Sequence, residues 1–389
     1  MNLSSIPKKT ILIFSTAYVP FVGGAEVAMK EITDRIDEYN FVMVTAKMDK
    51  KLPKKEQIGN IIVYRIGVGI PMVDKLYLAL FGHIKGIALH KKHNFSCVWS
   101  LMASYCGFSA RKFKKKTNVP FLLTLQEGDP IDYILHKVRF VKKQFKEIFL
   151  LADGLQAIST YLFDWGKDMG FVGAVAEVVP NGVDVARFTK KYTDEELVAV
   201  RKSFGFEENA KILVTASRLV VKNDVESVIK ALPLLAKDVC FVICGTGDLD
   251  ERLAGLAKEL GVFDRVTFLG NQSHEELPKI LHASDAFVRP SITEGLGNAF
   301  LEAMAVGLPT IGTRVGGIPD FLEDGKTGFF CEVQNPQSIA DTIVRIQHLS
   351  AEEKKHIHNN AMEVITQRYN WEYISGRMKH IFTSLCASS

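Results

Sequence analysis

The chain begins the same structural pattern twice, and this repetition constrains its fold more than any other feature. A short apolar run over residues 10–15 leads through a loop with a glycine pair into a helical pattern over residues 25–38. A second apolar run, residues 211–216, leads through another loop into a helical pattern over residues 224–236. Strands that alternate with helices are typical of parallel sheets with crossover helices. The sequence therefore predicts the α/β class.

Further short runs of β-forming residues alternate with amphipathic stretches behind each start. They cover residues 41–45, 61–65, 97–100, 121–125 and 154–158 in the first half, and residues 239–244, 265–268, 286–289, 309–312 and 328–330 in the second. A chain of 389 residues can form two cores of this size. We expect two Rossmann-like doubly wound domains that face a central cleft, with ligands outside the carboxyl ends of the strands.

The two predicted domains differ in charge. A turn-rich segment over residues 179–184 marks the boundary, which gives an N-terminal domain over residues 1–181 and a C-terminal domain over residues 182–389. Residues 1–180 hold 25 Lys/Arg and 16 Asp/Glu, a net charge of +9, whereas the remainder holds 23 and 28, a net charge of −5. This asymmetry indicates different partners for the two domains.

Composition excludes several classes of protein. Hydrophobic residues make up 47% of the chain and charged residues 24%, which are globular values and exclude disordered and collagen-like chains. The six cysteines form no C-x-x-C pair, so we expect reduced thiols and no zinc site. The N-terminal apolar run is too short for a signal-peptide core. The most apolar stretch, residues 72–89, is interrupted by charged residues, so we expect no transmembrane helix.

The densest group of candidate functional residues surrounds one glycine-rich loop of the second half. Glu294 follows a predicted strand, and Gly295 and Gly297 allow the backbone to approach a ligand closely. A helix is predicted to start near Asn298, where its N–H groups suit a phosphate or sugar hydroxyls. Glu302, about one turn into that helix, can accept hydrogen bonds from a ribose diol. A glycine loop with exposed glutamates is the alternative, but the spacing at a strand-to-helix junction favours a ligand site.

Two cations and two more glycines follow other predicted strands of the second half. Arg218 and Lys222 lie in one loop and can converge on a single anion, and a guanidinium with an ammonium suits a diphosphate. Gly245 and Gly247 follow the next strand and fit a loop beneath a nucleotide. This glycine pair lacks the third glycine and the Lys-Ser/Thr of other nucleotide motifs, so NAD and P-loop ATP sites are disfavoured.

Two further motifs are weaker signals of a ligand site. Gly23 and Gly24 open the first predicted helix and offer backbone donors to an anion, although such a pair is more often a turn. Asp248 and Asp250 form a D-x-D pattern that can hold a divalent metal on a diphosphate. Because aspartate commonly caps a helix start, we expect a cap and no metal site.

Together these residues resemble the retaining glycosyltransferases of family 4, the glycosyl transferases group 1, which have the GT-B fold. The resemblance covers nearly the whole chain, and its most specific part is the Glu294-x₇-Glu302 motif. Its other motifs are Gly23-Gly24, Asn181-Gly-Val-Asp184, Ser217-Arg-Leu219, Gly270, Gly307-Leu-Pro309 and Trp371. By this resemblance, Arg218 and Lys222 hold the donor diphosphate, and Glu302 holds the ribose. The transferred sugar is held by Glu294 and the backbone of Leu296, Gly297 and Asn298.

One position departs from the family's pattern. After the predicted strand at residues 121–125 the family commonly has a histidine that reaches the sugar at the reacting centre, and this chain has Gln126. An amide donates and accepts hydrogen bonds but does not take up a proton. The predicted catalytic residues are Glu294, Arg218, Lys222 and Gln126. The predicted donor-binding residues are Gly23, Gly24, Gly245, Gly247, Gly295, Leu296, Gly297, Asn298 and Glu302.

The resemblance implies the retaining transfer of a hexose-type sugar from a UDP- or GDP-sugar to a hydroxyl of a glycan, lipid-linked or small-molecule acceptor. Charge develops on the leaving phosphate in an oxocarbenium-like transition state, and the two cations would stabilise it. The departing phosphate would take the acceptor's proton. We expect no cofactor and no metal. A nucleotide-sugar epimerase or hydrolase on the same fold, or a non-catalytic nucleotide-sugar-binding protein, is the alternative.

The resemblance assigns the acceptor to the N-terminal domain and implies that the last helices, about residues 366–389, pack back on it. Residues 131–150 are predicted to form one amphipathic helix with basic residues along its flank, and residues 111–116 add a second basic run. Contact with an anionic membrane and a simple solvated surface are equally weighted interpretations. Nucleic-acid binding is disfavoured because aromatic residues do not interleave with the basic ones. We expect a cytoplasmic protein, either free or peripheral on the inner face of the membrane.

Overall fold

The chain divides into two compact units, each built on one sheet. The computed structural model describes residues 8–21 and 23–387. The first unit takes in residues 1–181 together with residues 371–389, and the second unit takes in residues 182–370.

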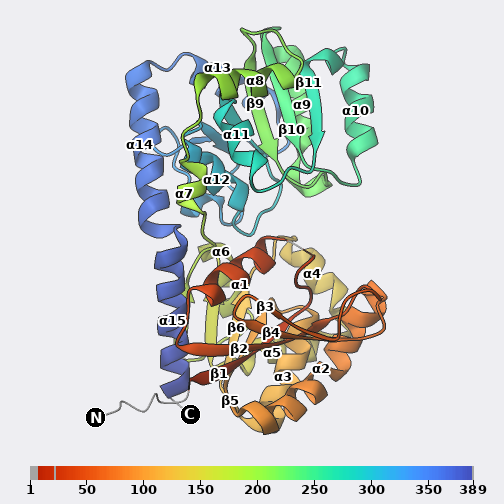
Figure 1. Ribbon diagram of the computed structural model, residues 1–389. Coiled ribbons are helices and arrows are strands. Elements are labelled where there is room, and N and C mark those ends of the chain that lie inside the picture. Colours follow the sequence, from red (N-terminus) through yellow and green to blue (C-terminus); the bar gives the residue numbers. More distant parts are fainter. Residues whose placement is uncertain (1–7, 22, 388–389) are drawn as a thin grey trace, which may run out of the picture. The chain divides into compact units, whose positions relative to one another are not determined.

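An eight-stranded sheet forms the first unit (Figure 1). Its strands are β1 (Lys9–Ser15), β2 (Tyr39–Ala46), β3 (Lys55–Ile58), β4 (Ile61–Ile66), β5 (Phe95–Leu101), β6 (Phe121–Leu125), β7 (Gly154–Ala157) and β8 (Val175–Val178). Their order is β3-β4-β2-β1-β5-β6-β7-β8, and every neighbouring pair is parallel except β3 and β4. The winding direction reverses between β1 and β5, which makes this the switch point at which ligands bind in such sheets.

Helices pack on both faces of this sheet. They are α1 (Gly24–Asp34), α2 (Pro71–His93), α3 (Tyr105–Thr117), α4 (Ile131–Lys137), the 3₁₀ turn η1 (Arg139–Val141), α5 (Lys142–Leu150), α6 (Thr160–Asp168) and α15 (Trp371–Ala387). Helices α1 and α15 contribute to one buried cluster with β1, β2 and β5. Helices α2 and α3 pack against each other on the opposite face, where Phe113 of α3 meets Phe14 of β1.

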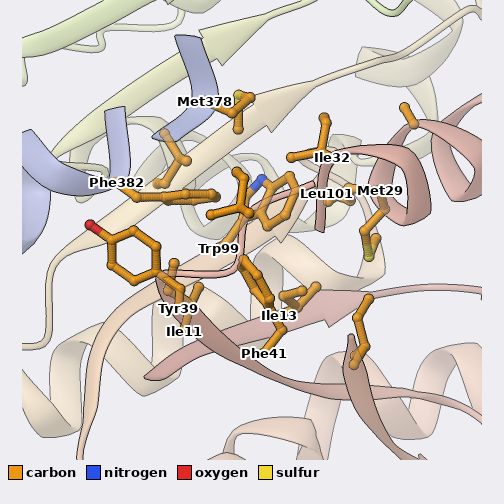
Figure 2. Close-up of a cluster of buried hydrophobic side chains, with 14 of the residues drawn as sticks. Ile11, Ile13, Met29, Ile32, Tyr39, Phe41, Trp99, Leu101, Met378 and Phe382 are labelled. Atoms are coloured by element: carbon orange, nitrogen blue, oxygen red, sulfur yellow. The ribbon is translucent and has the colours of Figure 1, made fainter. Parts of the chain in front are cut away.

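Trp99 of β5 lies inside the cluster that α1 and α15 cover (Figure 2). The ring of Phe382, from α15, packs edge-on against Trp99 with the ring centroids 5.3 Å apart. Phe41 of β2 contacts the same phenylalanine. The indole Nε1 of Trp99 donates a hydrogen bond to the Thr124 hydroxyl at 2.8 Å, so its polar atom is satisfied within the core. Residues from the end of the chain thus complete the core of the first unit.

Six parallel strands form the sheet of the second unit. They are β9 (Lys211–Ala216), β10 (Val239–Cys244), β11 (Val266–Gly270), β12 (Ala286–Val288), β13 (Thr310–Gly312) and β14 (Phe329–Phe330). The order β11-β10-β9-β12-β13-β14 is the strand order of dinucleotide-binding domains, with the switch point between β9 and β12.

The helices of the second unit connect these strands. They are α7 (Val185–Phe188), α8 (Asp194–Ser203), α9 (Val225–Ala231), α10 (Asp250–Glu259), α11 (Glu276–His282), α12 (Asn298–Val306), α13 (Pro336–Gln347) and α14 (Ala351–Arg368), with the 3₁₀ turns η2 (Val221–Asn223), η3 (Leu232–Leu234), η4 (Phe263–Arg265) and η5 (Ile318–Asp320). Side chains of α9, α10 and α13 share one buried cluster with the sheet. The predicted α/β class with two Rossmann-like doubly wound domains is confirmed.

The prediction of one amphipathic helix over residues 131–150 is wrong. The 3₁₀ turn η1 separates α4 from α5. β-branched Val138 precedes this turn and Val141 is its last residue, and their restricted side chains weaken a helix at that point. Within the predicted apolar face, only α5 supplies fully buried residues, namely Phe145, Ile148 and Phe149. The first seven residues, which belong to the predicted N-terminal domain, lie outside the described part of the chain.

Candidate active site

Two loops leave the sheet of the second unit at its switch point. One follows β9 and carries Arg218 and Lys222, and the other follows β12 and carries Glu294. Because β9 and β12 are neighbouring parallel strands, both loops start at the same edge of the sheet. The Ile292 N–H donates a hydrogen bond to the Lys222 carbonyl at 2.8 Å, which ties the loops together. The structure therefore brings together the two strongest motifs of the second half.

Glu294 is held by its own loop. Its carboxylate forms an ion pair with Arg289, at the carboxyl end of β12, and the Gly295 N–H donates to its other oxygen at 3.2 Å. Arg289 also donates to the Ser291 hydroxyl at 3.2 Å and lies over the Phe300 ring, 4.6 Å from its centroid. Arg289 is a buried cation at the end of a strand, and its pairing with Glu294 was not predicted from the sequence. Contacts within the chain thus orient the Glu294 carboxylate.

Two glycines allow the backbone conformation of the loop that carries Glu294. Gly297 precedes α12 with φ of 93°, a left-handed conformation that L side chains rarely adopt. A Cβ there would lie 2.6 Å from the Phe300 ring. A Cβ on Gly316, in the loop after β13, would lie 1.7 Å from the Glu294 carbonyl. The Gly295 and Leu296 backbone is buried within the same turn, and α12 begins at Asn298 as predicted.

Glu302 lies one turn inside α12. No described residue donates a hydrogen bond to its carboxyl group, while the charges of Arg289 and Arg187 act on it from a distance. Burial raises the pKa of Glu302 to about 7. This effect of burial outweighs the opposite effect of the two cations on the pKa. A carboxyl group that is desolvated and has no protein donor is suited to accept hydroxyl donors from a ligand.

The loop after β9 presents an exposed cation. The Arg218 side chain is exposed and has no ion-pair partner among the described residues, whereas Lys222 is half-buried in η2. Ser217, which precedes Arg218, has a buried hydroxyl without a hydrogen-bond partner in the described chain. Buried polar atoms are nearly always paired in folded proteins, so this hydroxyl at the switch point is a further candidate ligand contact that the sequence did not single out.

Gly245 and Gly247 have a structural explanation of their own. A Cβ on Gly245, which has φ of 139°, would lie 1.9 Å from the Ser217 carbonyl, and a Cβ on Gly247 would lie 2.3 Å from the Leu219 carbonyl. Both glycines therefore allow the loop after β10 to pack directly on the loop after β9. Asp250 accepts a hydrogen bond from the Gly247 N–H at 2.8 Å and is the first residue of α10. The donor-binding role of the two glycines stays a prediction.

The first unit holds the remaining predicted residues. Gly23 and Gly24 are exposed at the start of α1, with Gly23 as the N-cap in an extended conformation. The carboxylate of Glu26 takes hydrogen bonds from the backbone of this helix start, while burial raises its pKa. An acidic side chain thus already occupies part of the positive end of α1.

Gln126 follows β6 and is half-buried. Its backbone N–H donates to one carboxylate oxygen of Glu127 at 2.9 Å, and the Ala103 N–H donates to the other at 2.7 Å. Glu127 thereby joins the loops after β5 and β6. Burial raises the pKa of Glu127 to about 7, although both hydrogen bonds oppose the shift. The sequence did not indicate this buried carboxyl group, because its partner Ala103 is 24 positions away.

The described residues contain no group of three or more His, Cys, Asp and Glu side chains arranged to hold a metal ion.

Family models match both parts of the chain. The model described as Glycosyltransferase Family 4 matches residues 22–187, and the model described as Glycosyl transferases group 1 matches residues 199–364. The chain is also 28% identical over 260 residues to the GDP-mannose-dependent monoacylated alpha-(1-6)-phosphatidylinositol monomannoside mannosyltransferase of Corynebacterium glutamicum, covering 62% of this chain and 65% of that protein. The chain spans between 40 and 65% of the length of the curated relatives compared.

Solved structures show the same fold over nearly the full length. Sucrose-phosphate synthase from Thermosynechococcus elongatus has a TM-score of 0.85 at 20% identity, over 98% of this chain and 100% of the other. Anabaena HepE in complex with UDP-glucose has a TM-score of 0.77 at 18% identity, over 96% of this chain and 99% of the other. The predicted GT-B fold is confirmed by this likeness. With a family model matched on each unit, the chain belongs to the family 4 glycosyltransferases.

Proposed function

We propose that the chain is a retaining glycosyltransferase that moves a hexose-type sugar from a nucleotide-diphosphate sugar to a hydroxyl acceptor. The observation that carries this proposal is the pairing of two loops at the switch point of the second unit, where the Ile292 N–H bonds to the Lys222 carbonyl at 2.8 Å. This edge carries cations suited to a diphosphate, on one loop, and carboxylates suited to hydroxyls, on the other. A nucleotide-diphosphate sugar needs cations for its diphosphate and hydrogen-bond acceptors for its sugar hydroxyls.

Each part of the donor has a candidate contact. Arg218, Lys222 and the orphan hydroxyl of Ser217 would contact the diphosphate. Glu302, which has no protein donor, would accept the ribose hydroxyls, and Glu294 would orient the sugar. As the bond from the anomeric carbon to the phosphate oxygen breaks, the cations would stabilise the charge on the leaving group. The leaving phosphate would take the proton from the acceptor hydroxyl as the new glycosidic bond forms on the same face. No metal ion is needed in this scheme.

For the nucleotide base of the donor and for the acceptor, we propose classes of compound and not single compounds. A UDP- or GDP-sugar is the proposed donor, since the printed names of similar proteins include both UDP-glucose and GDP-mannose. The proposed acceptor is a glycan, a small molecule or a lipid-linked hydroxyl, in the cytoplasm or at the inner face of a membrane. In the first unit, Gly23 and Gly24 are proposed as donor-binding residues and Gln126 as a catalytic residue.

The test is acceptor-dependent release of nucleotide diphosphate. The purified chain is incubated with a panel of UDP- and GDP-sugars, with and without added acceptors, and with and without a chelator. Release that needs an acceptor, persists with the chelator and yields a product with the donor's anomeric configuration supports the proposal. Release without acceptor would identify a hydrolase, and binding without any release would identify a non-catalytic nucleotide-sugar-binding protein.

A further inference from the structure

The solvent-facing side of α2 is apolar. Seven of its large hydrophobic side chains are exposed, namely Met72, Val73, Leu76, Tyr77, Leu80, Phe81 and Ile84. Four of these recur at every fourth position and are at least half exposed: Met72 by 59%, Leu76 by 50%, Leu80 by 52% and Ile84 by 56%. Positions four apart share one face of a helix, so these side chains form a continuous stripe. A surface helix ordinarily turns polar residues to solvent, and a stripe of this kind marks an interaction surface.

The opposite side of α2 fixes this orientation. Gly82 and Gly86 face the protein interior, where a Cβ on Gly82 would lie 2.6 Å from the Ser109 hydroxyl and a Cβ on Gly86 would lie 2.9 Å from the Phe14 ring. The Ser109 hydroxyl also donates a hydrogen bond to the Leu78 carbonyl. Only glycine permits this close contact with α3 and β1 (Figure 1). The helix therefore cannot rotate to bury its apolar stripe against its own sheet.

The segment that carries the stripe is basic. Residues 68–118 contain nine Lys/Arg and a single acidic residue, Asp74. Three of the nine, Arg111, Lys114 and Lys115, form ion pairs with Glu147 or Asp153 outside the segment. Asp74 is buried, and its carboxylate accepts hydrogen bonds from the Val68 and Gly69 N–H groups, both at 2.7 Å. No carboxylate from this segment is thus available at the surface. Lys112 of α3 donates to the Leu80 carbonyl at 3.0 Å, which places a cation at the edge of the stripe.

We propose that this face of α2 docks the chain on an anionic lipid membrane. Apolar side chains would enter the interface, and the surrounding lysines would contact the negative headgroups. The stripe from Met72 to Ile84 is about 18 Å long at 1.5 Å per residue, which suits a helix that lies flat. Over residues 8–21 and 23–387, no helix is both long enough and apolar enough to cross a membrane. This surface gives a location to the membrane association within the proposed function, and its test needs no glycosyl transfer.

A second copy of the chain fits the same face less well. Two-fold symmetry would place the stripe of one copy on the stripe of the other. Lys112 at the edge of each stripe would then approach the other copy, and residues 68–118 expose no carboxylate to pair with it, which disfavours the contact. Phosphate headgroups supply the opposite charge that the segment lacks. Tyr77 and Phe81, whose ring centroids lie 5.0 Å apart, suit the boundary between headgroups and acyl chains.

The test is sedimentation of the full chain with lipid vesicles. Vesicles of phosphatidylcholine alone are compared with vesicles that also contain phosphatidylglycerol, at low and high salt. The wild type should sediment with the anionic vesicles and less at high salt. Replacing Leu76→Ser together with Leu80→Ser should weaken the partition by roughly tenfold or more, because two leucines no longer enter the apolar layer. The matched control is Leu234→Ser in η3, which is 51% exposed in the second unit and should leave sedimentation unchanged.

Two further variants keep the proposal falsifiable. Lys112→Glu with Lys116→Glu should weaken binding to anionic vesicles by roughly fivefold or more. Leu80→Trp should show a blue-shifted emission on anionic vesicles, and this readout applies even where the serine variant does not fold. Equal binding to neutral and anionic vesicles, no emission shift, or a serine variant that changes a dimer into a monomer without changing sedimentation would each overturn the proposal. Sedimentation without any glycosyl transfer would support the docking surface and contradict only the proposed activity.

Discussion

Arg289 and Glu294 form an ion pair inside the loop that follows β12. Both side chains are largely buried, with 8% of Arg289 and 14% of Glu294 exposed. The arginine comes from the strand end and the glutamate from the turn before α12, so the pair fixes the loop that carries the proposed sugar contact. A site held in place before its ligand arrives loses less conformational entropy on binding.

The Arg289→Ala variant should be markedly less stable. It leaves the Glu294 carboxylate buried without its cation and removes the contact with Phe300. Breaking a buried ion pair in this way costs about 3 kcal/mol. Urea unfolding followed by circular dichroism measures the loss, with Arg345→Ala as the control because the Arg345–Asp324 pair is exposed. A loss below about 1 kcal/mol for Arg289→Ala would show that the pair does not hold the loop.

The Arg218→Ala variant should separate activity from stability. Arg218 is exposed and unpaired among the described residues, so the free energy of unfolding should change by less than about 0.5 kcal/mol. With the donor that the panel identifies, kcat/KM should fall by roughly 100-fold, a typical loss when a partner of the developing charge is removed. Arg252→Ala is the control, since Arg252 is an exposed cation of the same unit. Equal kinetic effects of the two substitutions would argue against a specific diphosphate contact.

Glu302 should make stability depend on pH. Its pKa is about 7 in the folded chain, above the value of 4.5 that an exposed glutamate has. Between these values the folded chain binds more protons than the unfolded chain, so stability falls as pH rises through this range. The Glu302→Gln variant loses this titration. Its stability relative to wild type should therefore be about 1–2 kcal/mol higher at about pH 8 than at about pH 5.

Unfolding curves of both proteins across this range measure the difference directly. Glu127 titrates in the same region, and the comparison with wild type removes its contribution because both proteins contain it. A stability difference that does not change with pH would contradict the raised pKa of Glu302.

Gly297 and Gly255 should respond in opposite directions to alanine. Gly297 has φ of 93° and no room for a Cβ, so Gly297→Ala should cost about 1–3 kcal/mol of stability. Gly255 lies within α10, and a Cβ there meets nothing within 4 Å, so Gly255→Ala should add about 0.5–1 kcal/mol. Thermal unfolding of the two variants tests both statements. A neutral Gly297→Ala variant would mean that the loop adopts another path.

Strands that are buried on both faces could be predicted closely from the sequence. Predicted strands at residues 121–125, 211–216 and 239–244 coincide with β6, β9 and β10, because continuous apolar runs are typical of central parallel strands. The edge strand β3 was not predicted. Its residues Lys55 to Ile58 include two charged side chains, and none of the four is fully buried. Pairing with β4 along one edge, and not apolar burial, makes this segment a strand.

In the candidate site, too, local features could be predicted from the sequence, whereas contacts between distant segments could not. Glu294, the two glycines and the start of α12 lie within one strand, loop and helix, so their arrangement follows from local sequence. The partners of Glu294 and Glu127 depend on how separate segments pack, and no spacing in the sequence reports them. The membrane association predicted from residues 131–150 and 111–116 stays a prediction. The exposed apolar stripe lies on another helix, α2, because residue periodicity alone does not tell which face of a helix is buried.

Calorimetric titration with UDP and GDP is the sharpest test of the proposed donor site. We predict that the wild-type chain binds at least one of these nucleotides at a single site. Two charge-assisted contacts to phosphate are together worth about 3 kcal/mol or more, so Arg218→Ala combined with Lys222→Ala should raise Kd by roughly 100-fold. Arg252→Ala should leave Kd unchanged. Absence of binding of both nucleotides to a folded wild-type chain, or equal Kd values in wild type and the double variant, would contradict the proposed donor site.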